Sequence, residues 1–282
     1  MHEHLRAAFA EVGITDLRAS QAPGDEARLV HEAIADGVQT IVVAGGDGTW
    51  GKSAVALAKA GSPARMAFVA AGTGNDFAKN LRAPCRDLRA MARLVASGGV
   101  ERRVDLGRVN DSWFANCAGF GFDVAVIHAT KRFPALRGPT VYVAAALREL
   151  MAYGGLDARL EGVDGESSTR WARRLMIIFA NGRVFGGTFP IAPGAAVDDG
   201  QLDAVVFDES TLLGRVPLLL RALRGTHAAH PRVRHSTGAR WLLECREPPW
   251  FELDGDLSRA PSSTVEIAVV PRALRVVDVA SR

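Results

Sequence analysis

Residues 41–49 read Ile41-Val42-Val43-Ala44-Gly45-Gly46-Asp47-Gly48-Thr49, a β-branched apolar run that enters a glycine-rich turn with one carboxylate. The apolar run is typical of a strand. Glycine at 45, 46 and 48 permits positive φ and a close approach of backbone N–H groups to a polyphosphate. Asp47 is suited to the divalent ion of a nucleoside triphosphate, and we expect Thr49 to cap a following helix. The alternative is a plain strand-to-helix turn.

A second glycine loop follows the next apolar run. Residues 66–71 form a short strand-like segment that ends in Gly72-Thr73-Gly74-Asn75-Asp76-Phe77. If both strands lie in one parallel sheet, with a helix at 52–60 as the crossover, their carboxyl ends open on the same edge, where doubly wound folds bind ligands. Asp47 and Asp76 then share one site. Asn75 or Asp76 could also cap a helix that runs to Leu81.

The two loops and four later segments together resemble the diacylglycerol kinase and sphingosine kinase family, especially its bacterial soluble lipid kinases. The segments are GGDGT at 45–49, GTGNDFA at 72–78, FANCAGFGFD at 114–123, NGRVFGG at 181–187, DDGQLD at 198–203 and LDGD at 253–256. They follow the family's order and span nearly the whole chain. NAD kinases share a similar first segment, so GTGND and DDGQLD favour the lipid kinases.

The resemblance implies an ATP-dependent kinase that transfers the γ-phosphoryl of Mg·ATP to the hydroxyl of a lipid alcohol, most readily diacylglycerol. ATP and Mg²⁺ are the implied cofactors. The implied nucleotide-binding residues are Ser20, Gly45, Gly46, Asp47, Gly48, Thr49, Gly72, Thr73, Gly74 and Asn75.

In the family, an acid in a late Asp-Gly-Glu segment accepts the proton of the lipid hydroxyl. Asp256 stands in that place, one methylene shorter than glutamate, so its reach requires closer backbone approach or a bridging water. Asp254, Asp76 and Asp47 are the other implied catalytic residues. The sequence also contains a literal Asp-Gly-Glu triplet at 164–166, but its place between two strand-like runs is typical of a hairpin turn. DDGQLD resembles the family's structural magnesium loop, with Asp199 as side-chain ligand and the carbonyls of Ala196 and Gln201 completing the shell. The alternative is a tight turn ahead of a strand at 202–207.

Two departures from the family concern the nucleotide site. Relatives open with a strand and an Asn-Pro loop, whereas this sequence starts inside the expected first helix, which would leave a sheet neighbour unpaired. After GGDGT, relatives read aliphatic-Asn-Glu, and this chain has Trp50-Gly51-Lys52. We expect Trp50 to be core rather than an adenine platform. Lys52 either approaches phosphates or points to solvent.

The chain of 282 residues is long enough for two domains. We expect a doubly wound, mostly parallel α/β domain over 1–104, with helices near 3–12, 24–36 and 86–97 and a strand near 14–19. Over 105–282 we expect a β-rich, sandwich-like domain with one helix at 139–152 and a tail able to return to the first domain. The resemblance puts the active site in the cleft between them.

Composition limits the partners and the compartment. No apolar run reaches roughly 18 residues and no signal peptide is evident, so we expect a soluble, cytoplasmic protein. Cys85, Cys117 and Cys245 have no Cys-x-x-Cys spacing, and we interpret them as buried thiols. The net charge is +3, with basic clusters at 131–137 and 221–235 that either dock anionic headgroups or form solvated faces.

The basic clusters leave peripheral contact with a membrane open, and a homodimer is also open. No nucleic-acid-binding module accompanies the basic residues, so we expect no nucleic-acid partner. Aromatic residues near the later glycine stretches either line an acyl-chain groove or fill the core; they are Phe120, Phe122, Phe185 and Phe189. Two further hypotheses remain. One is an NAD kinase-like enzyme, and the other is a nucleotide- or lipid-binding regulator with weak catalysis.

Overall fold

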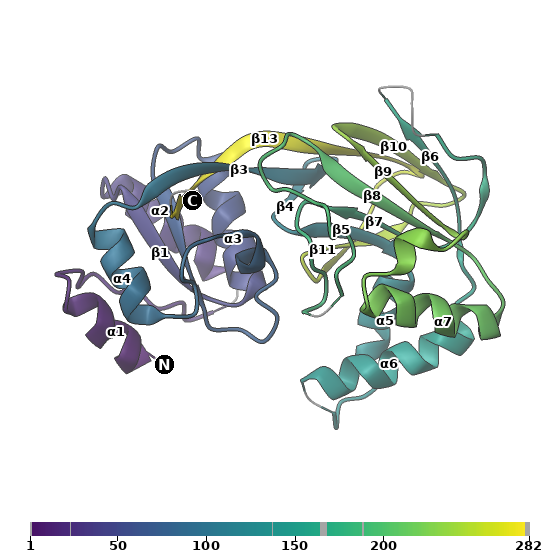
Figure 1. Ribbon diagram of the computed structural model, residues 1–282, viewed down its shortest axis with the longest axis horizontal. Helices are drawn as coiled ribbons and strands as arrows, with labels where there is room; N and C mark the ends of the chain where they lie inside the picture. The colour runs from purple at the N-terminus through teal and green to yellow at the C-terminus, as the bar shows by residue number, and fades with distance from the viewer. Residues whose placement is uncertain (1, 23, 137, 164–167, 188, 280–282) are drawn as a thin grey trace.

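The computed structural model describes residues 2–22, 24–136, 138–163, 168–187 and 189–279, so the predicted hairpin turn at 164–166 lies outside the described residues. The N-terminal part alternates helices and strands. Its elements are α1 (His2–Ala10), α2 (Asp25–Ala35), β1 (Thr40–Gly45), α3 (Asp47–Lys59), β2 (Arg65–Ala70), the short 3₁₀ helix η1 (Phe77–Asn80) and α4 (Leu88–Ala96). Figure 1 shows this part beside a β-rich part with its own helices.

Strands β1 and β2 pair in parallel, in register from Thr40 opposite Arg65 to Gly45 opposite Ala70. Because the strands end level, the glycine loops that follow them start at the same edge of the sheet. Helix α3 is the crossover between the strands, as expected. The sheet continues from β2 into the final strand, β13, which also runs parallel to β2. The predicted mostly parallel α/β fold is confirmed.

The predicted strand at 14–19 is wrong, because these residues form no regular structure. Ile14 and Leu17 contact the apolar core, but most of the stretch is exposed. Strand β1 ends the sheet in this structure, with β2 as its neighbour. A strand needs a neighbour to take its backbone hydrogen bonds, and the 14–19 segment forms no such ladder with β1.

The C-terminal part is built mainly from antiparallel strands. Its strands are β3 (Val100–Val109), β4 (Ser112–Phe114), β5 (Cys117–Gly121), β6 (Leu156–Gly162), β7 (Ala172–Ala180), β8 (Leu202–Asp208), β9 (Val233–Gly238), β10 (Arg240–Cys245), β11 (Trp250–Leu253), β12 (Asp256–Arg259) and β13 (Thr264–Asp278). Its helices are α5 (Phe122–Thr130), α6 (Pro139–Ala152), α7 (Leu212–Leu223) and the 3₁₀ helix η2 (His227–Ala229). The sandwich-like, β-rich expectation is confirmed.

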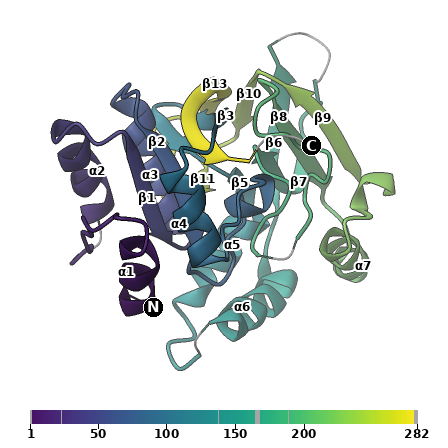
Figure 2. The same cartoon turned by 60° about the vertical axis from the view of Figure 1, so that its left-hand side comes forward.

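Strands β3 and β13 run antiparallel across both parts of the molecule, and Figure 2 shows them at its centre. The predicted division after residue 104 falls inside β3. The pairing of β13 is interrupted between Val270 and Leu274, where Arg272 has φ of 55°. The fully buried Asp105 accepts the Arg272 N–H at 2.6 Å and the Gly200 N–H at 2.7 Å. One carboxylate thus fixes this irregularity and the DDGQLD loop together.

Three apolar clusters form the core. One lies in the α/β part and includes Trp50, which is fully buried, donates its indole N–H to the Val43 carbonyl and packs edge-on against Phe68. A second fills the interior between the strands and includes Phe120. The third lies between strands and helices and includes Phe122. The predicted core position of Trp50 is therefore confirmed, and Phe120 and Phe122 follow the core alternative.

Helix α6 begins and ends where the sequence predicts, with a proline in its first turn. Helices α5 and α7 were not predicted. Helix α5 is rich in β-branched residues and begins directly after strand β5, and α7 carries Pro217 in its interior, so neither has an ordinary helix sequence. Among the described residues, no helix combines the length and the apolar character that crossing a bilayer requires.

Candidate active site

The two glycine loops touch each other. A Cβ atom at Gly72 would lie 2.4 Å from Cα of Gly46, and one at Gly74 would lie 2.7 Å from Oδ2 of Asp47. The expectation of positive φ in the first loop is wrong, since the positive-φ glycines lie elsewhere in the chain. Close approach of two backbones, rather than a left-handed conformation, is what requires glycine at 46 and 72.

Thr49 does not cap α3, because the helix already begins at Asp47 after an extended Gly46. The Thr49 side chain instead occupies the space beside Gly45, where an added Cβ would lie 2.7 Å from the Cβ of Thr49. At Gly48 an added Cβ would meet nothing within 4 Å. The first helical turn therefore presents an open backbone surface next to Asp47. The N-terminus of a helix is favourable for anions such as phosphate.

Asp47 links the loops through its carboxylate. Its Oδ1 accepts the N–H of Asp76 at 2.6 Å and that of Phe77 at 3.4 Å. Burial raises the pKa of Asp47, and the nearby charge of Asp76 raises this pKa further. A divalent cation at this place would relieve the repulsion between the two carboxylates. The residues present at the loops therefore fit a Mg²⁺ ion carried by a nucleotide.

Asp76 joins the N-terminal part to the C-terminal part. Its Oδ1 pairs with Nζ of Lys79 at 2.7 Å, and its Oδ2 accepts the Gly187 N–H at 2.8 Å. Lys79 in turn donates to the Gly187 carbonyl at 2.6 Å. Capping by Asn75 or Asp76 is not observed: η1 has no side-chain cap, and the Asn75 amide bonds both backbone groups of Gly72. The GTGND loop thus holds the NGRVFGG segment.

Asp254 reaches the same region from the end of β11. Its Oδ2 accepts the Ala115 N–H at 2.7 Å, and its Oδ1 accepts the N–H groups of Asn116 and Cys117 at 2.8 and 3.0 Å. Its φ of 50° is unusual for an aspartate and directs the side chain into this nest of amides. Burial, opposed by the three N–H donors, raises the pKa of Asp254 to about 6, and the charge of Asp47 adds to the rise.

The segment Trp50-Gly51-Lys52 faces the LDGD segment. A Cβ at Gly51 would lie 2.9 Å from Oδ2 of Asp254, so glycine lets helix α3 approach that carboxylate. Lys52 forms an ion pair with Asp256 at 3.1 Å, and both side chains are exposed. Lys52 is therefore exposed, as one of its two alternatives had it, and its ion pair is with Asp256. Asp256 is exposed, while Asp254 is half-buried between α3 and the backbone N–H groups of residues 115–117.

Two buried acids lie behind Asp254. A Cβ at Gly119 would lie 1.7 Å from Oδ2 of Asp123 and 2.9 Å from Oε1 of Glu252, so these carboxyl groups converge on one small volume. Among the described residues, neither carboxyl oxygen of Asp123 has a hydrogen-bond partner. Burial raises the pKa of Asp123 to about 7, while burial and then the charge of Asp123 raise the pKa of Glu252 well above its usual range. Such a pair retains a proton near neutral pH.

The predicted magnesium loop is a tight turn in which Oδ1 of Asp199 accepts the Gln201 N–H at 3.0 Å. Its neighbour Asp198 is bound to Arg102 instead. Burial raises the pKa of Asp199, and the nearby charges of Asp203 and Asp105 raise it further. The two neighbouring acids have partners of their own: Asp105 accepts the Gly200 and Arg272 N–H groups, and Asp203 bonds His235. Among the described residues, no cluster of three or more His, Cys, Asp or Glu side chains is placed to hold a metal ion. A Mg²⁺ ion at this turn would therefore depend on Asp199 and on backbone carbonyls.

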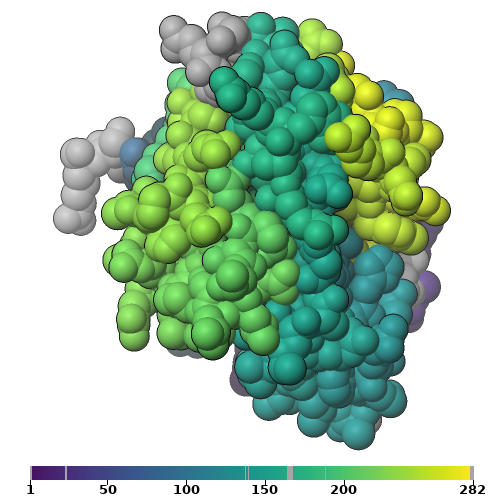
Figure 3. Space-filling view, turned by 90° about the vertical axis from the view of Figure 1, so that its right-hand side faces the viewer, coloured from purple at the N-terminus to yellow at the C-terminus, as the bar shows by residue number. Residues whose placement is uncertain are grey.

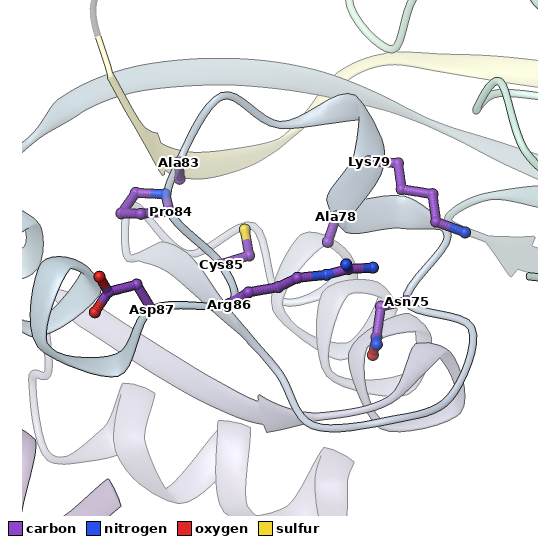
Figure 4. Close-up of a pocket in the computed structure, with 8 residues that line it drawn as sticks. All are labelled: Asn75, Ala78, Lys79, Ala83, Pro84, Cys85, Arg86 and Asp87. Atoms are coloured by element: carbon purple, nitrogen blue, oxygen red, sulfur yellow. The ribbon is translucent and has the colours of Figure 1, made fainter.

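A cavity of about 540 Å³ adjoins the GTGND loop, and Figure 4 shows its lining residues. Asn75 and Lys79 line it together with Arg86, whose side chain extends toward Asn75. Its size is in the range of small-molecule sites. Ser20 lies in the exposed irregular stretch after α1, outside the group of contacts that joins the two loops.

Sequence reasoning missed Glu252, Lys79 and Asp105, and it treated Asp123 only as part of a motif. Glu252 lies between Phe251 and Leu253 in a strand, where an acid is unexpected, and that position was the available signal. The half-buried rings of Phe185 and Phe189 face each other across a short bridge, with centroids 6.4 Å apart. The three cysteines are free and buried, as interpreted from the sequence.

Comparison with known families covers nearly the whole chain. Residues 1–109 match the diacylglycerol kinase catalytic domain, and residues 116–278 match the YegS C-terminal NAD kinase beta sandwich-like domain. A protein of Xanthomonas oryzae named "Probable lipid kinase YegS-like" is 34% identical over 274 residues, covering 93% of this chain and 85% of the relative. A "Diacylglycerol kinase" of Mycobacterium tuberculosis is 31% identical over 257 residues, covering 89% and 81%.

A solved structure described as a diacylglycerol kinase from Bacillus anthracis superposes with a TM-score of 0.70 at 18% identity, covering 96% of this chain and 88% of the other. That likeness shows a common fold. The family matches and the identity to the curated relatives show the family itself. This chain belongs to the diacylglycerol kinase and YegS-like lipid kinase family.

Proposed function

We propose that this protein is an ATP-dependent kinase that transfers the γ-phosphoryl group of Mg·ATP to the hydroxyl of a lipid alcohol, with diacylglycerol as the first candidate. One observation carries the proposal: helix α3, which begins at Asp47 of the first glycine loop, approaches Asp254 so closely that a Cβ at Gly51 would lie 2.9 Å from Oδ2 of Asp254. A phosphoryl transfer site needs a phosphate-binding loop and a proton acceptor in one cleft.

In the proposed function, the two glycine loops bind the phosphates of the nucleotide. The open backbone at Gly48 and the first turn of α3 supply N–H groups, and Asp47 supplies a carboxylate for the metal. Mg²⁺, when bound, would neutralise charge on the phosphates and at Asp47. The remaining residues implied for the nucleotide are those of the two loops, with Ser20 as an outlying candidate. Asp199, with the carbonyls of Ala196 and Gln201, would hold a second, structural Mg²⁺.

We assign the proton acceptor to Asp254 rather than to Asp256. A general base works best with a pKa near the working pH, and the pKa of Asp254 is raised to about 6. Three backbone N–H groups fix its direction. Asp256 is exposed and paired with Lys52. We assign Asp256 the secondary role of holding Lys52 at the rim of the cleft.

The same proposal makes residues 1–104 the nucleotide-binding part and 105–282 the part that receives the lipid. Asp76 fits the role of a connector, since its two oxygens bond Lys79 and Gly187. In this role it positions the GTGND loop and contacts no reacting atom. We place the reaction on the cytoplasmic side of the membrane, where Mg·ATP is available.

The test is γ-phosphate transfer from labelled Mg·ATP to a panel of lipids: diacylglycerol, monoacylglycerol, a sphingoid base and phosphatidylglycerol. Asp254→Asn and Asp256→Asn are assayed beside the unmodified protein. Label in one lipid, lost in Asp254→Asn and largely retained in Asp256→Asn, supports the proposal and the choice of base. Nucleotide binding without any labelled lipid would select a regulator instead.

A further inference from the structure

Helix α6 exposes a row of large apolar side chains. Val143, Leu147 and Met151 recur every four residues along one face and are all exposed, Met151 to 75%. Tyr142 flanks them. The opposite side of the helix contains the buried Ala145. An ordinary surface helix turns its apolar stripe to the core, whereas α6 carries a second apolar stripe that no element of the described part of the chain covers.

Helix α7 shows the same feature. Leu213, Val216, Leu220 and Leu223 follow helical spacing on its outer side, and Leu213 is 86% exposed. Leu218, on the other side, is fully buried. Helices α6 and α7 contact each other, and Figures 1 and 3 show them adjoining on the outer face of the C-terminal part. The two rows form one apolar surface, which we call the α6–α7 face: Tyr142, Val143, Leu147, Met151, Leu213, Val216, Leu220 and Leu223.

The exposed charges beside the α6–α7 face are positive, and the one acid within α6, Glu149, is buried and paired with Arg148. Residues 124–148 and 210–243, which contain most of α6 and all of α7, include no aspartate or glutamate. Lys131 and Arg132 follow α5 and precede α6, and Arg221 and Arg224 lie in the last turn and at the end of α7; all four are exposed. An apolar surface beside exposed cations complements an anionic lipid surface.

We propose that the α6–α7 face docks this protein on an anionic phospholipid bilayer, with its leucines entering the headgroup boundary and its cations contacting phosphates. A second copy of the chain is the less suitable occupant, because pairing this face with itself would bring equal sets of cations together. This docking surface extends the proposed function and rests on it, because a kinase that acts on a membrane lipid must reach the bilayer.

The position of the face fits that purpose. Helix α5 begins with Phe122 and Asp123, behind Asp254, and packs along α6. The helix that carries Asp123 therefore lies directly against the helix that carries the exposed apolar row. Docking through α6 and α7 leaves the α/β part, with its glycine loops, away from the contact surface and accessible to nucleotide.

The experiment is co-sedimentation of the purified protein with vesicles of phosphatidylcholine, alone or with phosphatidylglycerol, at low and high salt. Leu147→Ser/Leu213→Ser removes two exposed apolar side chains without touching the core. Arg221→Gln/Arg224→Gln removes two cations. Val163→Ser, an exposed apolar residue at the end of β6, is the matched control.

We expect binding to anionic vesicles that weakens in salt. The leucine double variant should bind at least tenfold more weakly, since fully burying one leucine accounts for roughly a tenfold change or more. The arginine variant should lose most of the salt dependence, and Val163→Ser should bind as the unmodified protein does. Equal binding by the leucine variant, or no vesicle binding by the unmodified protein, would overturn the proposal.

Two further readouts separate this proposal from its alternatives. If the unmodified protein sediments as a dimer that Leu147→Ser/Leu213→Ser converts to monomer, with no vesicle binding, the face is a contact between copies. On a short-chain diacylglycerol dissolved as monomers, the leucine variant should keep the full rate of phosphorylation. Vesicle binding without kinase activity on any lipid would refute the proposed function and leave the docking surface standing, while the reverse pattern would refute the docking surface alone.

Discussion

The substitution Asp254→Asn should lower the catalytic rate strongly while it changes the stability of the fold little. The amide keeps one oxygen for two of the three backbone N–H groups that Asp254 now accepts, but its NH₂ faces the third as a second donor. An unsatisfied buried donor costs about 1–3 kcal/mol. Against that cost, the variant no longer has to ionise a half-buried acid whose pKa is raised from 3.8 to about 6. Well above pH 6, removing this ionisation stabilises the folded state by about 3 kcal/mol.

These opposing changes predict nearly unchanged stability for Asp254→Asn at pH 8, measured by thermal unfolding. Activity should fall far more, because loss of a general base lowers the rate by about 10²–10⁴-fold. In the unmodified enzyme, kcat/KM should decrease about tenfold per pH unit below an apparent pKa of about 6. In Asp254→Asn that acidic limb should disappear.

The matched control is Asp256→Asn, which breaks the exposed ion pair with Lys52. An exposed pair of this kind contributes about 0–1 kcal/mol, so we expect a loss of about fivefold or less. A variant Asp254→Asn with more than a tenth of normal activity and an intact acidic limb would refute the assignment. If Asp256→Asn were the inactive variant, the proton acceptor would be Asp256.

Three further predictions concern the surroundings of the site. Gly119→Ala should destabilise the fold by about 3 kcal/mol in urea unfolding, because the added methyl would lie 1.7 Å from Oδ2 of Asp123; an unchanged midpoint would contradict the packing. Because the pKa values of Asp123 and Glu252 are raised, the folded state binds more protons than the unfolded state between about pH 4 and pH 7. The contribution of the protonated pair to the free energy of unfolding is therefore complete below about pH 4 and is lost as pH rises through about 7. The free energy of unfolding of Glu252→Gln relative to the unmodified protein should therefore rise from pH 5 to pH 8, and a flat or falling difference would be evidence against the acid pair. Asp199→Asn should reduce the increase in melting temperature that Mg²⁺ produces, whereas Asp198→Asn, whose native carboxylate is bound to Arg102, should preserve it; equal effects would remove Asp199 from the metal site.

Local patterns in the sequence were sufficient to predict the two glycine loops and the strands that precede them. The apolar runs before Gly45 and Gly72 predict parallel strands, and the structure brings both loops together at one edge. Helix α6 was predicted to the residue because Gly138-Pro139 marks its start. These features depend on neighbours in the sequence, which a reader of the sequence can see.

Features that depend on contacts between residues far apart in the sequence could not be predicted from local patterns. Helix α7 is stabilised by burying Leu218 and Ala222 against the third core cluster, despite its internal proline. The convergence of Asp123 and Glu252 at Gly119 requires β5 and β11 to pair. The expected strand at 14–19 failed because its apolar residues pack on the core without a strand partner. The relative depth of Asp254 and Asp256 likewise became visible only with the fold.

Transfer of labelled γ-phosphate from Mg·ATP, with diacylglycerol vesicles and NAD offered in parallel reactions, tests the proposed lipid kinase most directly. We expect label in the lipid fraction, none in NAD, and loss of the label in Asp254→Asn. Bound nucleotide with unlabelled lipid, or label in NAD instead of the lipid, would refute the proposed function.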